Sequence, residues 1–270
     1  MIDPKYFDPR RYFAFARRKY IDLFYTETVS RQAVEADQAE AFAGVGLDYA
    51  AAVRRLDEML AAMGLPPYDE SDGMASQHWT LFAGIAAASP VRDILEIGTF
   101  NARGTLVLSR LFPDSRIVTL DLDDASPHFN DSYGRNDIAF REAHIRERTA
   151  NLARCPNATF LPANSFHMPK HLAGRRFDLI WVDGSHDYPA IAWDMFHALH
   201  SLNPDGWLLA DDVFRHPKAR WLPYANDGHD LIRYLAVDGI VAPRFVAKRV
   251  QETRINRIRE KHILVLRQDG

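Results

Sequence analysis

The chain has 270 residues, which is enough for one large domain or for a standard core with an added segment. Its formal net charge of −3 gives no electrostatic footprint for binding nucleic acid, and its 47% hydrophobic and 26% charged residues are typical of a soluble globular protein. No apolar run approaches the about 20 residues that span a bilayer, and the single cysteine, Cys155, excludes an internal disulfide. We therefore expect a cytoplasmic protein with neither a nucleic-acid partner nor a membrane partner.

The first 73 residues show no alternation typical of β-strands. Residues 10–30 and 31–63 are rich in helix formers, and the run GLPPYDESDG at 64–73 has the composition of a linker. We expect residues 1–73 to form a helical lid or oligomerisation segment and residues 74–270 to form the main domain. A homo-oligomer, a dimer or larger, is the expected assembly.

From residue 75 onward, short aliphatic runs alternate with helical patterns. The runs predict strands, and the patterns between them predict helices. The strands are expected at 94–98, 116–122, 158–164, 177–183, 206–212, 243–250 and 262–267. The helices are expected at 75–88, 103–111, 138–153, 188–201 and 227–237. Such alternation indicates an α/β fold with a parallel sheet covered by helices on both faces. The last two strands leave no room for a crossover helix, so we favour an antiparallel pair at the end of the chain.

The loop after the first strand, within LEIGTFNARGTLVL (95–108), contains two glycines suited to a sharp turn, Gly98 and Gly104. The dinucleotide fingerprint G-x-G-x-x-G requires a glycine where this chain has Phe100, and a phenylalanine side chain there would crowd a diphosphate. The nucleoside-triphosphate loop also fails, because Thr105 and no lysine follows Gly104. Both phosphate-binding loops are thus disfavoured.

Two acids near this loop suggest a different ligand. Glu96 lies inside the first strand, where a carboxylate would repel phosphates but suit a cation, and Asp121 ends the second strand, where an acid typically accepts hydrogen bonds from ribose hydroxyls. An anionic loop, an acid for ribose and no phosphate cradle together describe a positively charged nucleoside. S-adenosylmethionine fits that description.

Three segments resemble the class I S-adenosylmethionine-dependent methyltransferases: ILEIGTFNARGTLVL, the acid in VTLDLD, and FDLIWVDGSHDYPAIAWDMFHALHSLNPDGWLLADD. They are most similar to the metal-dependent small-molecule O-methyltransferases of the catechol and macrolide-sugar types, and the resemblance covers about residues 75–215. It implies a Rossmann-like, doubly wound, seven-stranded sheet of order 3-2-1-4-5-7-6 with strand 7 antiparallel, preceded here by the N-terminal helical extension.

The resemblance also implies the cofactor-binding residues. Glu96 and Gly98 would lie by the methionine portion, Asp121 would take the ribose, and Asn164 with Ser165 would lie at the adenine edge. The full set of candidates is Gln77, Glu96, Gly98, Thr99, Phe100, Asn101, Gly104, Asp121, Leu122, Asn164, Ser165 and Asp183. Purely structural alternatives stay open: a plain turn at Gly98, a helix cap at Asp121 and a loop turn at Asn164.

Three further acids follow neighbouring strands. Asp183 ends the strand FDLIWV, and Asp211 and Asp212 follow GWLLA. Because neighbouring strands lie about 4.8 Å apart, these carboxylates can converge, and their mutual repulsion would be relieved by a divalent cation. Oxygen ligands suit Mg²⁺, Mn²⁺ or Ca²⁺, and metal-dependent relatives hold a cation with acids at these strand ends, so we predict a metal site of Asp183, Asp211 and Asp212 with Mg²⁺ as a cofactor. The alternative is that the acids remain without a metal.

The predicted reaction is methyl transfer to a small molecule that carries a hydroxyl group, such as a sugar, a glycoside or a phenol. The metal would lower the hydroxyl pKa, and Asp183 and His186 are the catalytic candidates, with His186 as general base. Asp187 is expected to cap the helix that starts near Tyr188 and Pro189.

The substrate is expected to contact residues of the loop after the fifth strand. Trp221 and Tyr224 would line its pocket, and His216 and His229 are weaker candidates. The alternatives for the whole chain are a non-methylating member of the fold, such as a cofactor-binding or hydroxylase-associated protein, and an N-methyltransferase, although the N-x-P-P-[YF] motif of amine methylators is absent.

Overall fold

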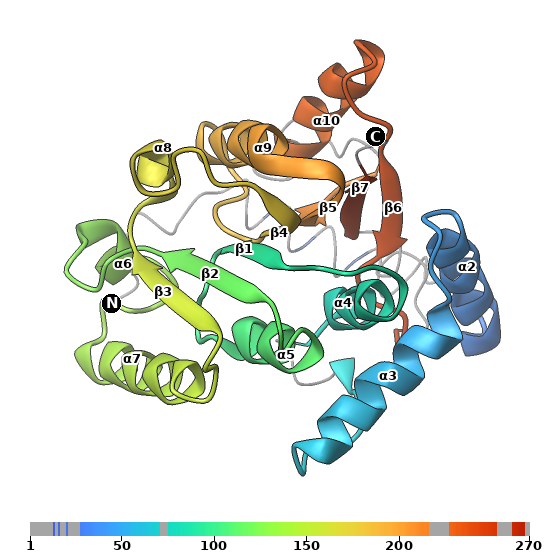
Figure 1. Cartoon of the computed structure of the whole chain (residues 1–270), viewed down its shortest axis with the longest axis horizontal. Coiled ribbons are helices and arrows are strands. Elements are labelled where there is room, and N and C mark those ends of the chain that lie inside the picture. Colours follow the sequence, from blue (N-terminus) through green and yellow to red (C-terminus); the bar gives the residue numbers. More distant parts are fainter. Residues whose placement is uncertain are drawn as a thin grey trace.

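The computed structural model describes residues 28–70, 75–215, 227–252 and 261–267, together with Phe13, Ala16 and Tyr20. Figure 1 shows a central twisted sheet with helices on both sides. Within the described ranges, no helix combines the length and the apolarity that crossing a bilayer requires.

The described residues form a seven-stranded sheet of order β3-β2-β1-β4-β5-β7-β6. Its strands are β1 (Asp93–Ile97), β2 (Arg116–Asp121), β3 (Ala158–Pro162), β4 (Phe177–Val182), β5 (Leu202–Val213), β6 (Arg244–Ala247) and β7 (His262–Arg267). Strands β1 to β5 pair in parallel, whereas β7 pairs antiparallel with both β5 and β6. The predicted order and the antiparallel pair at the end of the chain are confirmed.

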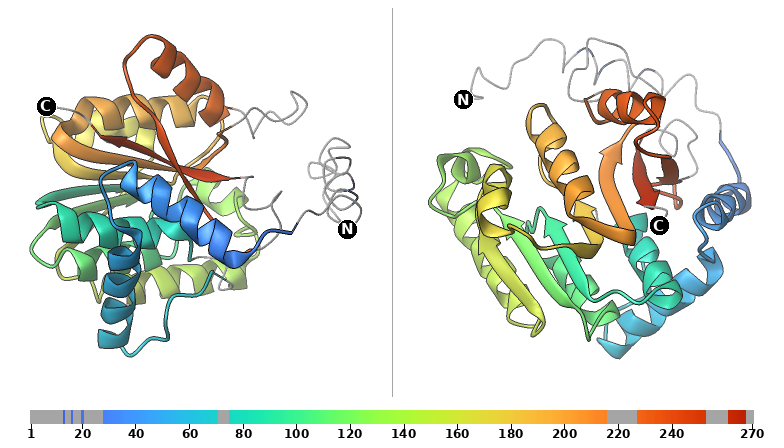
Figure 2. Two further views of the ribbon diagram at one scale, coloured as in Figure 1. Left: turned by 90° about the vertical axis from the view of Figure 1, so that its right-hand side faces the viewer. Right: turned by 45° about the horizontal axis from the view of Figure 1, so that its top comes forward.

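Helices cover both faces of the sheet (Figure 2). One layer contains α4 (Gln77–Ala88), α5 (Arg103–Leu111) and α7 (Ile138–Leu152), and the other contains α8 (Met168–His171), α9 (Ala190–Ser201) and α10 (Asp227–Val237). Adjacent residues of β1 enter separate hydrophobic clusters: Ile94 packs in the cluster with α4 and α5, and Leu95 in the cluster with α9 and α10. Burial on both faces explains why these strands are aliphatic throughout.

The N-terminal residues 31–63 form two helices, α2 (Arg31–Ala43) and α3 (Tyr49–Ala62). The break lies at GVGLD, where Gly46 has φ +77° and the Asp48 side chain accepts a hydrogen bond from Ala51 N at 2.8 Å to begin α3. Figure 2 shows α2 beside β6, and α3 packs on α4. Phe42 and Leu56 are fully buried in the same cluster as the sheet residues, so residues 28–70 share the core of the sheet. Of the expected helix at 10–30, only Phe13, Ala16 and Tyr20, which are helical, and residues 28–30, which are not, lie in the described part.

Two buried polar side chains fasten these helices to the sheet. The Gln38 amide of α2 donates to Ala247 O and accepts from Ala247 N, both at 3.1 Å. These two bonds satisfy the backbone N–H and C=O groups of the last residue of the edge strand β6. The Glu70 carboxylate accepts from Gln77 Nε2 at 2.8 Å and from the backbone N–H groups of Val250 and Gln251, each at 3.0 Å. One carboxylate therefore joins the N-terminal segment to α4 and to the chain after β6.

We expect Glu70→Ala to lower the free energy of unfolding by about 2–4 kcal/mol, because it leaves buried N–H donors without an acceptor. Urea unfolding followed by circular dichroism measures this. The matched control is Glu58→Ala on the exposed side of α3, which should stay within about 0.5 kcal/mol of the wild type. Equal stability of the two variants would contradict this role of Glu70.

Candidate active site

The loop after β1 meets the end of β4 through backbone contact. Gly98 has φ +103°, and a Cβ atom built there would lie 2.2 Å from the carbonyl oxygen of Asp183. Phe100 and Ala102 also have positive φ, +48° and +62°, so the loop turns sharply before α5. At Gly98 the backbone therefore lies too close to Asp183 for any residue except glycine. The alternative, a turn without such a contact, does not describe this position.

Glu96 of β1 is buried beneath this loop. Its carboxylate accepts hydrogen bonds from Thr105 Oγ1 at 2.5 Å and Thr119 Oγ1 at 2.6 Å, and a Cβ at Gly104 would lie 2.8 Å from its Oε1 atom. Burial raises the pKa of Glu96 to about 7, although both threonine hydroxyls act to lower it. Gly104 thus lets α5 pass over a carboxyl group that is held inside the protein.

Asp121 ends β2 and organises the same loop. Its two carboxylate oxygens accept from Phe100 N and Leu122 N, each at 2.7 Å. Burial raises the pKa of Asp121, while these two backbone N–H groups lower it. Neither donor lies in a helix, and the next helix, α6 (Pro127–Asp131), has Ser126 at its N-cap, so the helix-cap alternative for Asp121 is wrong.

Other cofactor candidates have side chains engaged elsewhere. Thr99 Oγ1 hydrogen-bonds Thr119 Oγ1 at 2.6 Å, and Asn101 Nδ2 donates to Glu147 of α7 at 3.0 Å. Gln77 hydrogen-bonds Glu70, as described above. These three side chains are engaged in contacts within the protein, and their cofactor contact stays a prediction.

The segment after β3 forms a short 3₁₀ helix, η3 (Ser165–His167). Asn164 Oδ1 accepts from Phe166 N at 2.9 Å and begins η3, which agrees with the loop-turn alternative for this residue. The Ser165 carbonyl accepts from Trp193 Nε1 at 3.1 Å. Trp193 therefore ties the expected adenine edge to α9, and adenine binding here stays a prediction.

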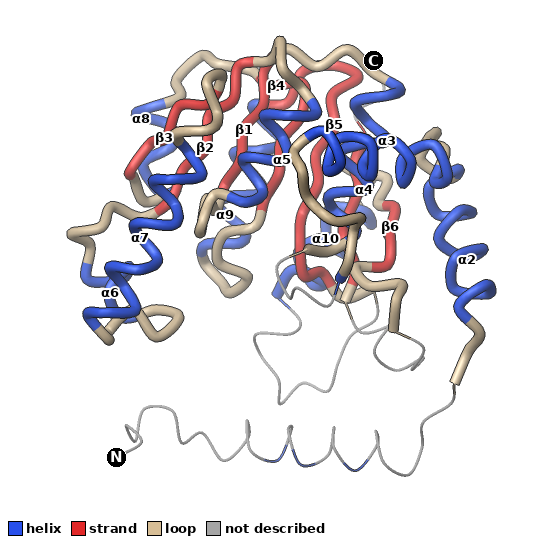
Figure 3. The backbone as a smooth tube through the Cα atoms, turned by 90° about the horizontal axis from the view of Figure 1, so that it is seen from below, coloured by secondary structure: helices blue, strands red, loops and turns tan. Residues whose placement is uncertain are grey.

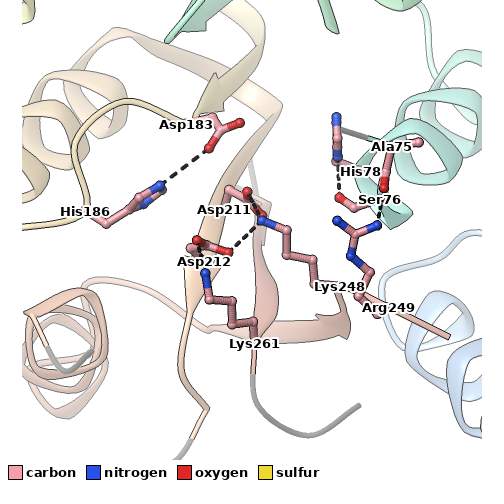
Figure 4. Close-up of polar contacts among 10 residues, drawn as sticks. All are labelled: Ala75, Ser76, His78, Asp183, His186, Asp211, Asp212, Lys248, Arg249 and Lys261. Atoms are coloured by element: carbon pink, nitrogen blue, oxygen red, sulfur yellow. Dashed lines mark hydrogen bonds and ion pairs between the residues drawn. The ribbon is translucent and has the colours of Figure 1, made fainter. Parts of the chain in front are cut away.

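Asp211 and Asp212 lie at an irregularity of β5. In a regular strand consecutive side chains point to opposite faces. Here the register with β7 shifts between Ala210 and Val213, and Asp212 has φ +54°, as in a β-bulge. The bulge brings both carboxylates to one place (Figure 4).

Two lysines contact these acids. Lys248 Nζ contacts Asp211 Oδ2 and, at 2.6 Å, Asp212 Oδ1, and Lys261 Nζ contacts Asp212 Oδ2 (Figure 4). Burial lowers the pKa of Lys248, but Asp211, Asp212 and then Asp183 raise it more, so the net shift is upward and the ammonium stays charged. Burial raises the pKa of Asp212, but the two lysines lower it by more, so the net shift is downward and its carboxylate stays charged as well.

Asp183 pairs instead with His186. His186 Nε2 lies 3.5 Å from Asp183 Oδ1, and the two side chains are 27% and 34% exposed, so solvent or a ligand can reach them. Burial lowers the pKa of His186, but Asp183 raises it more, so it lies above the ordinary 6.5. Burial and the neighbouring Asp211 raise the pKa of Asp183. An imidazole held by a carboxylate at a strand end can accept a proton near neutral pH.

Comparison with known proteins agrees with this arrangement. Residues 95–213 match a family model described as a methyltransferase domain. Over these residues the chain is therefore similar to methyltransferases. No curated protein sequence matches it.

Solved structures support the fold. A structure described as an O-methyltransferase from Klebsiella pneumoniae is 18% identical with a TM-score of 0.54, covering 80% of this chain and 90% of that one. Cofactor-bound Rv0187 from MTB is 17% identical with a TM-score of 0.54, covering 81% and 90%. The O-methyltransferase TomG from Streptomyces achromogenes, involved in tomaymycin synthesis and bound to S-adenosylmethionine, is 18% identical with a TM-score of 0.50, covering 85% and 95%. At these identities the similarity shows the fold alone.

The predicted metal site does not fit the contacts that these side chains make. Among the described residues, no three His, Cys, Asp or Glu side chains are arranged to hold a metal ion. The lysine ammonium groups occupy the oxygens of Asp211 and Asp212 that a cation would bind, and Asp183 pairs with His186. These contacts do not favour the expected triad with Mg²⁺, which stays a prediction.

The capping role expected of Asp187 is also wrong. Helix α9 begins at Ala190 after Pro189, and no side chain caps it. Asp187 contributes only its carbonyl oxygen, which accepts from Ile191 N at 3.1 Å. The Tyr188 N–H is bound by Asp227 Oδ2 at 2.8 Å, so the turn is fixed from α10.

The sequence interpretation missed Lys248 and Lys261 as partners of the acids. Their signal was the basic run VAKRVQETRINRIREK, which flanks and joins the last two strands. His229 was a substrate candidate, but its Nδ1 atom hydrogen-bonds Phe214 O at 2.9 Å. The other substrate candidates, His216, Trp221 and Tyr224, lie outside the described residues.

We expect Gly98→Ala to lower the free energy of unfolding by about 3 kcal/mol or more, because it adds both left-handed strain and a clash with the Asp183 carbonyl. Gly134→Ala is the matched control: its φ is +77° with nothing within 4 Å of the added Cβ, so strain alone should cost about 1–2 kcal/mol. Chemical denaturation compares them, and equal losses would show that the close approach is unimportant.

Proposed function

We propose that the protein transfers the methyl group of S-adenosylmethionine to a hydroxyl oxygen of a small molecule, with His186 as general base. The observation that carries this proposal is the pairing of His186 with Asp183 at the end of β4, against the loop of Gly98. A base is thereby held beside the loop where this fold binds its ligands, at the carboxyl ends of the strands. Figure 3 shows the segment with α6 extending beyond that edge of the sheet.

The residues around Asp121 fit the nucleoside part of the cofactor. Each carboxylate oxygen of Asp121 accepts one backbone N–H, and each retains a lone pair for a ribose hydroxyl. Phe100, in place of a second glycine, suits a ligand without a diphosphate. When bound, S-adenosylmethionine supplies an electrophilic methyl group on a sulfonium centre.

In the proposed proton transfer, His186 accepts the proton and Asp183 orients and stabilises the imidazole. Nε2 of His186 faces Asp183, so the imidazole N–H is directed to the carboxylate and the lone pair on Nδ1 is available to the acceptor hydroxyl. The acceptor oxygen would bond to the methyl carbon as the bond from that carbon to sulfur breaks, with S-adenosylhomocysteine as the leaving group. The hydroxyl proton would pass to Nδ1, and Asp183 would stabilise the imidazolium cation that results. Oxygen is the favoured acceptor because a hydroxyl needs such a base more than a neutral amine does.

The proposed partner is a small hydroxylated molecule such as a sugar, a glycoside or a phenol. The His186 and Asp183 side chains are only partly exposed, so a small group can reach them more easily than a folded partner can. A homo-oligomer remains part of this proposal as a prediction.

Cofactor binding is tested by calorimetric titration with S-adenosylmethionine. We expect the wild type to bind and Asp121→Ala to bind at least about tenfold more weakly, because two ribose hydrogen bonds are lost. Asp114→Ala, an exposed acid at the other end of β2, is the control and should bind as the wild type does. Absence of binding to the wild type would favour a non-methylating member of the fold.

The base is tested with a panel of catechols, phenols and glycosides as acceptors. We expect His186→Ala to lower kcat by about 10²–10⁴-fold while cofactor binding is retained. Since only neutral His186 accepts a proton and its pKa is raised above 6.5, wild-type activity should rise with pH through that pKa, and His186→Ala should lose this limb. His171→Ala on α8, an exposed histidine, is the control; an unchanged pH limb in His186→Ala would rule out the base.

A further inference from the structure

We infer that Lys248 replaces the divalent cation: its ammonium group provides, from within the chain, the positive charge that the two carboxylates of β5, Asp211 and Asp212, require. The protein then needs no metal ion at this site. This inference deepens the proposed function and rests on it only for the activity measurement below, because metal binding is measured on the protein alone.

The first support is burial. The side chains of Asp211, Asp212 and Lys248 are 5%, 17% and 16% exposed, so this cluster lies largely out of water. Buried carboxylates without a compensating cation are strongly destabilising. Lys248 contacts both carboxylates at once, as a bridging cation would, whereas Lys261 is 44% exposed and, of the acids that the structure describes, contacts only Asp212. The central charge is therefore that of Lys248.

The second support is the backbone of Lys248, which is fixed from two sides. Its N–H donates to Lys261 O at 3.2 Å, and its carbonyl accepts from Gln77 N at 3.1 Å, at the start of α4. The preceding residue, Ala247, is held by Gln38. The backbone that carries the Lys248 side chain is thus held by hydrogen bonds on both sides, unlike that of a surface lysine that lies near an acid by chance.

The third support is the number of donors. An ammonium group has three N–H donors, and the two carboxylates take two of them. The third can donate to the oxygen of a bound acceptor, which is the contact a metal would make. Among the described atoms, Asp211 Oδ1 is buried without a hydrogen-bond partner, so the charge of this carboxylate is compensated through its other oxygen, which Lys248 contacts.

The inference is tested by Mn²⁺ titration followed by electron paramagnetic resonance. We expect the wild type to bind Mn²⁺ no more tightly than about 1 mM, and Lys248→Met, which keeps the stem but removes the charge, to bind at least about tenfold more tightly. Lys261→Met is the matched control and should behave as the wild type, because Lys248 still compensates the acids. The double variant Lys248→Met/Asp211→Asn should lose the gained binding, which assigns it to this cluster.

The outcomes divide clearly. Micromolar Mn²⁺ binding by the wild type would overturn the inference, as would a folded Lys248→Met protein without the gain. If Lys248→Met does not fold, the wild-type titration still decides, and Lys248→Arg should fold and show no gain. Wild-type methyl transfer that survives EDTA supports the inference, and loss of transfer in EDTA that Mg²⁺ restores overturns it. A protein without methyl transfer leaves the Mn²⁺ result valid, so failure of the proposed function is distinguishable.

Discussion

The site depends on how closely the chain after β1 approaches the chain after β4. Gly98 lies so near the Asp183 carbonyl that no side chain fits between them, and the Asp183 N–H continues the sheet by donating to Ile97 O at 2.8 Å. This contact fixes where Asp183 ends its strand and hence where His186 stands three residues later. The same loop is held from the other side by Asp121. The loop after β1 and the proposed base are thus parts of one edge of the sheet.

Charge balance is the second constraint on this edge. Carboxyl groups collect there because four of the parallel strands, β1, β2, β4 and β5, carry an acid at or next to their ends: Glu96, Asp121, Asp183 and the pair in β5. The protein treats them differently. Glu96 accepts hydrogen bonds from hydroxyl groups and has a raised pKa, Asp183 pairs with His186, and the β5 acids pair with lysines. Each arrangement limits the repulsion that would otherwise oppose the folding of these strands together.

Most of the fold could be predicted from the sequence, because it is encoded locally. The aliphatic runs located the strands within a few residues, and the predicted bounds of the helix at 103–111 and the strand at 262–267 agree with the structure. The order of the strands came from the resemblance, since periodicity alone does not fix it. The short elements α6, η3 and α8 were missed because a helix of one turn leaves almost no periodic pattern.

The site was harder to predict because side-chain direction and distant contacts are not local. Asn101 and Thr99 stand in the right loop, yet their side chains turn inward to Glu147 and Thr119. The acids of β5 were expected at the site, but the bulge that turns both toward Lys248 has no sequence signature. Lys248 itself lies 36 positions from Asp212 along the chain, so its charge could not be assigned to the acids in advance.

The Gln38 side chain at the edge of the sheet has a consequence for assembly. Its amide makes with Ala247 the two hydrogen bonds that an added strand would make. A β-strand of a second copy cannot extend the sheet along the whole of β6 unless α2 is first displaced. Helix α2 therefore protects this edge against sheet extension between molecules, and an assembly that keeps α2 in place must be built from other surfaces.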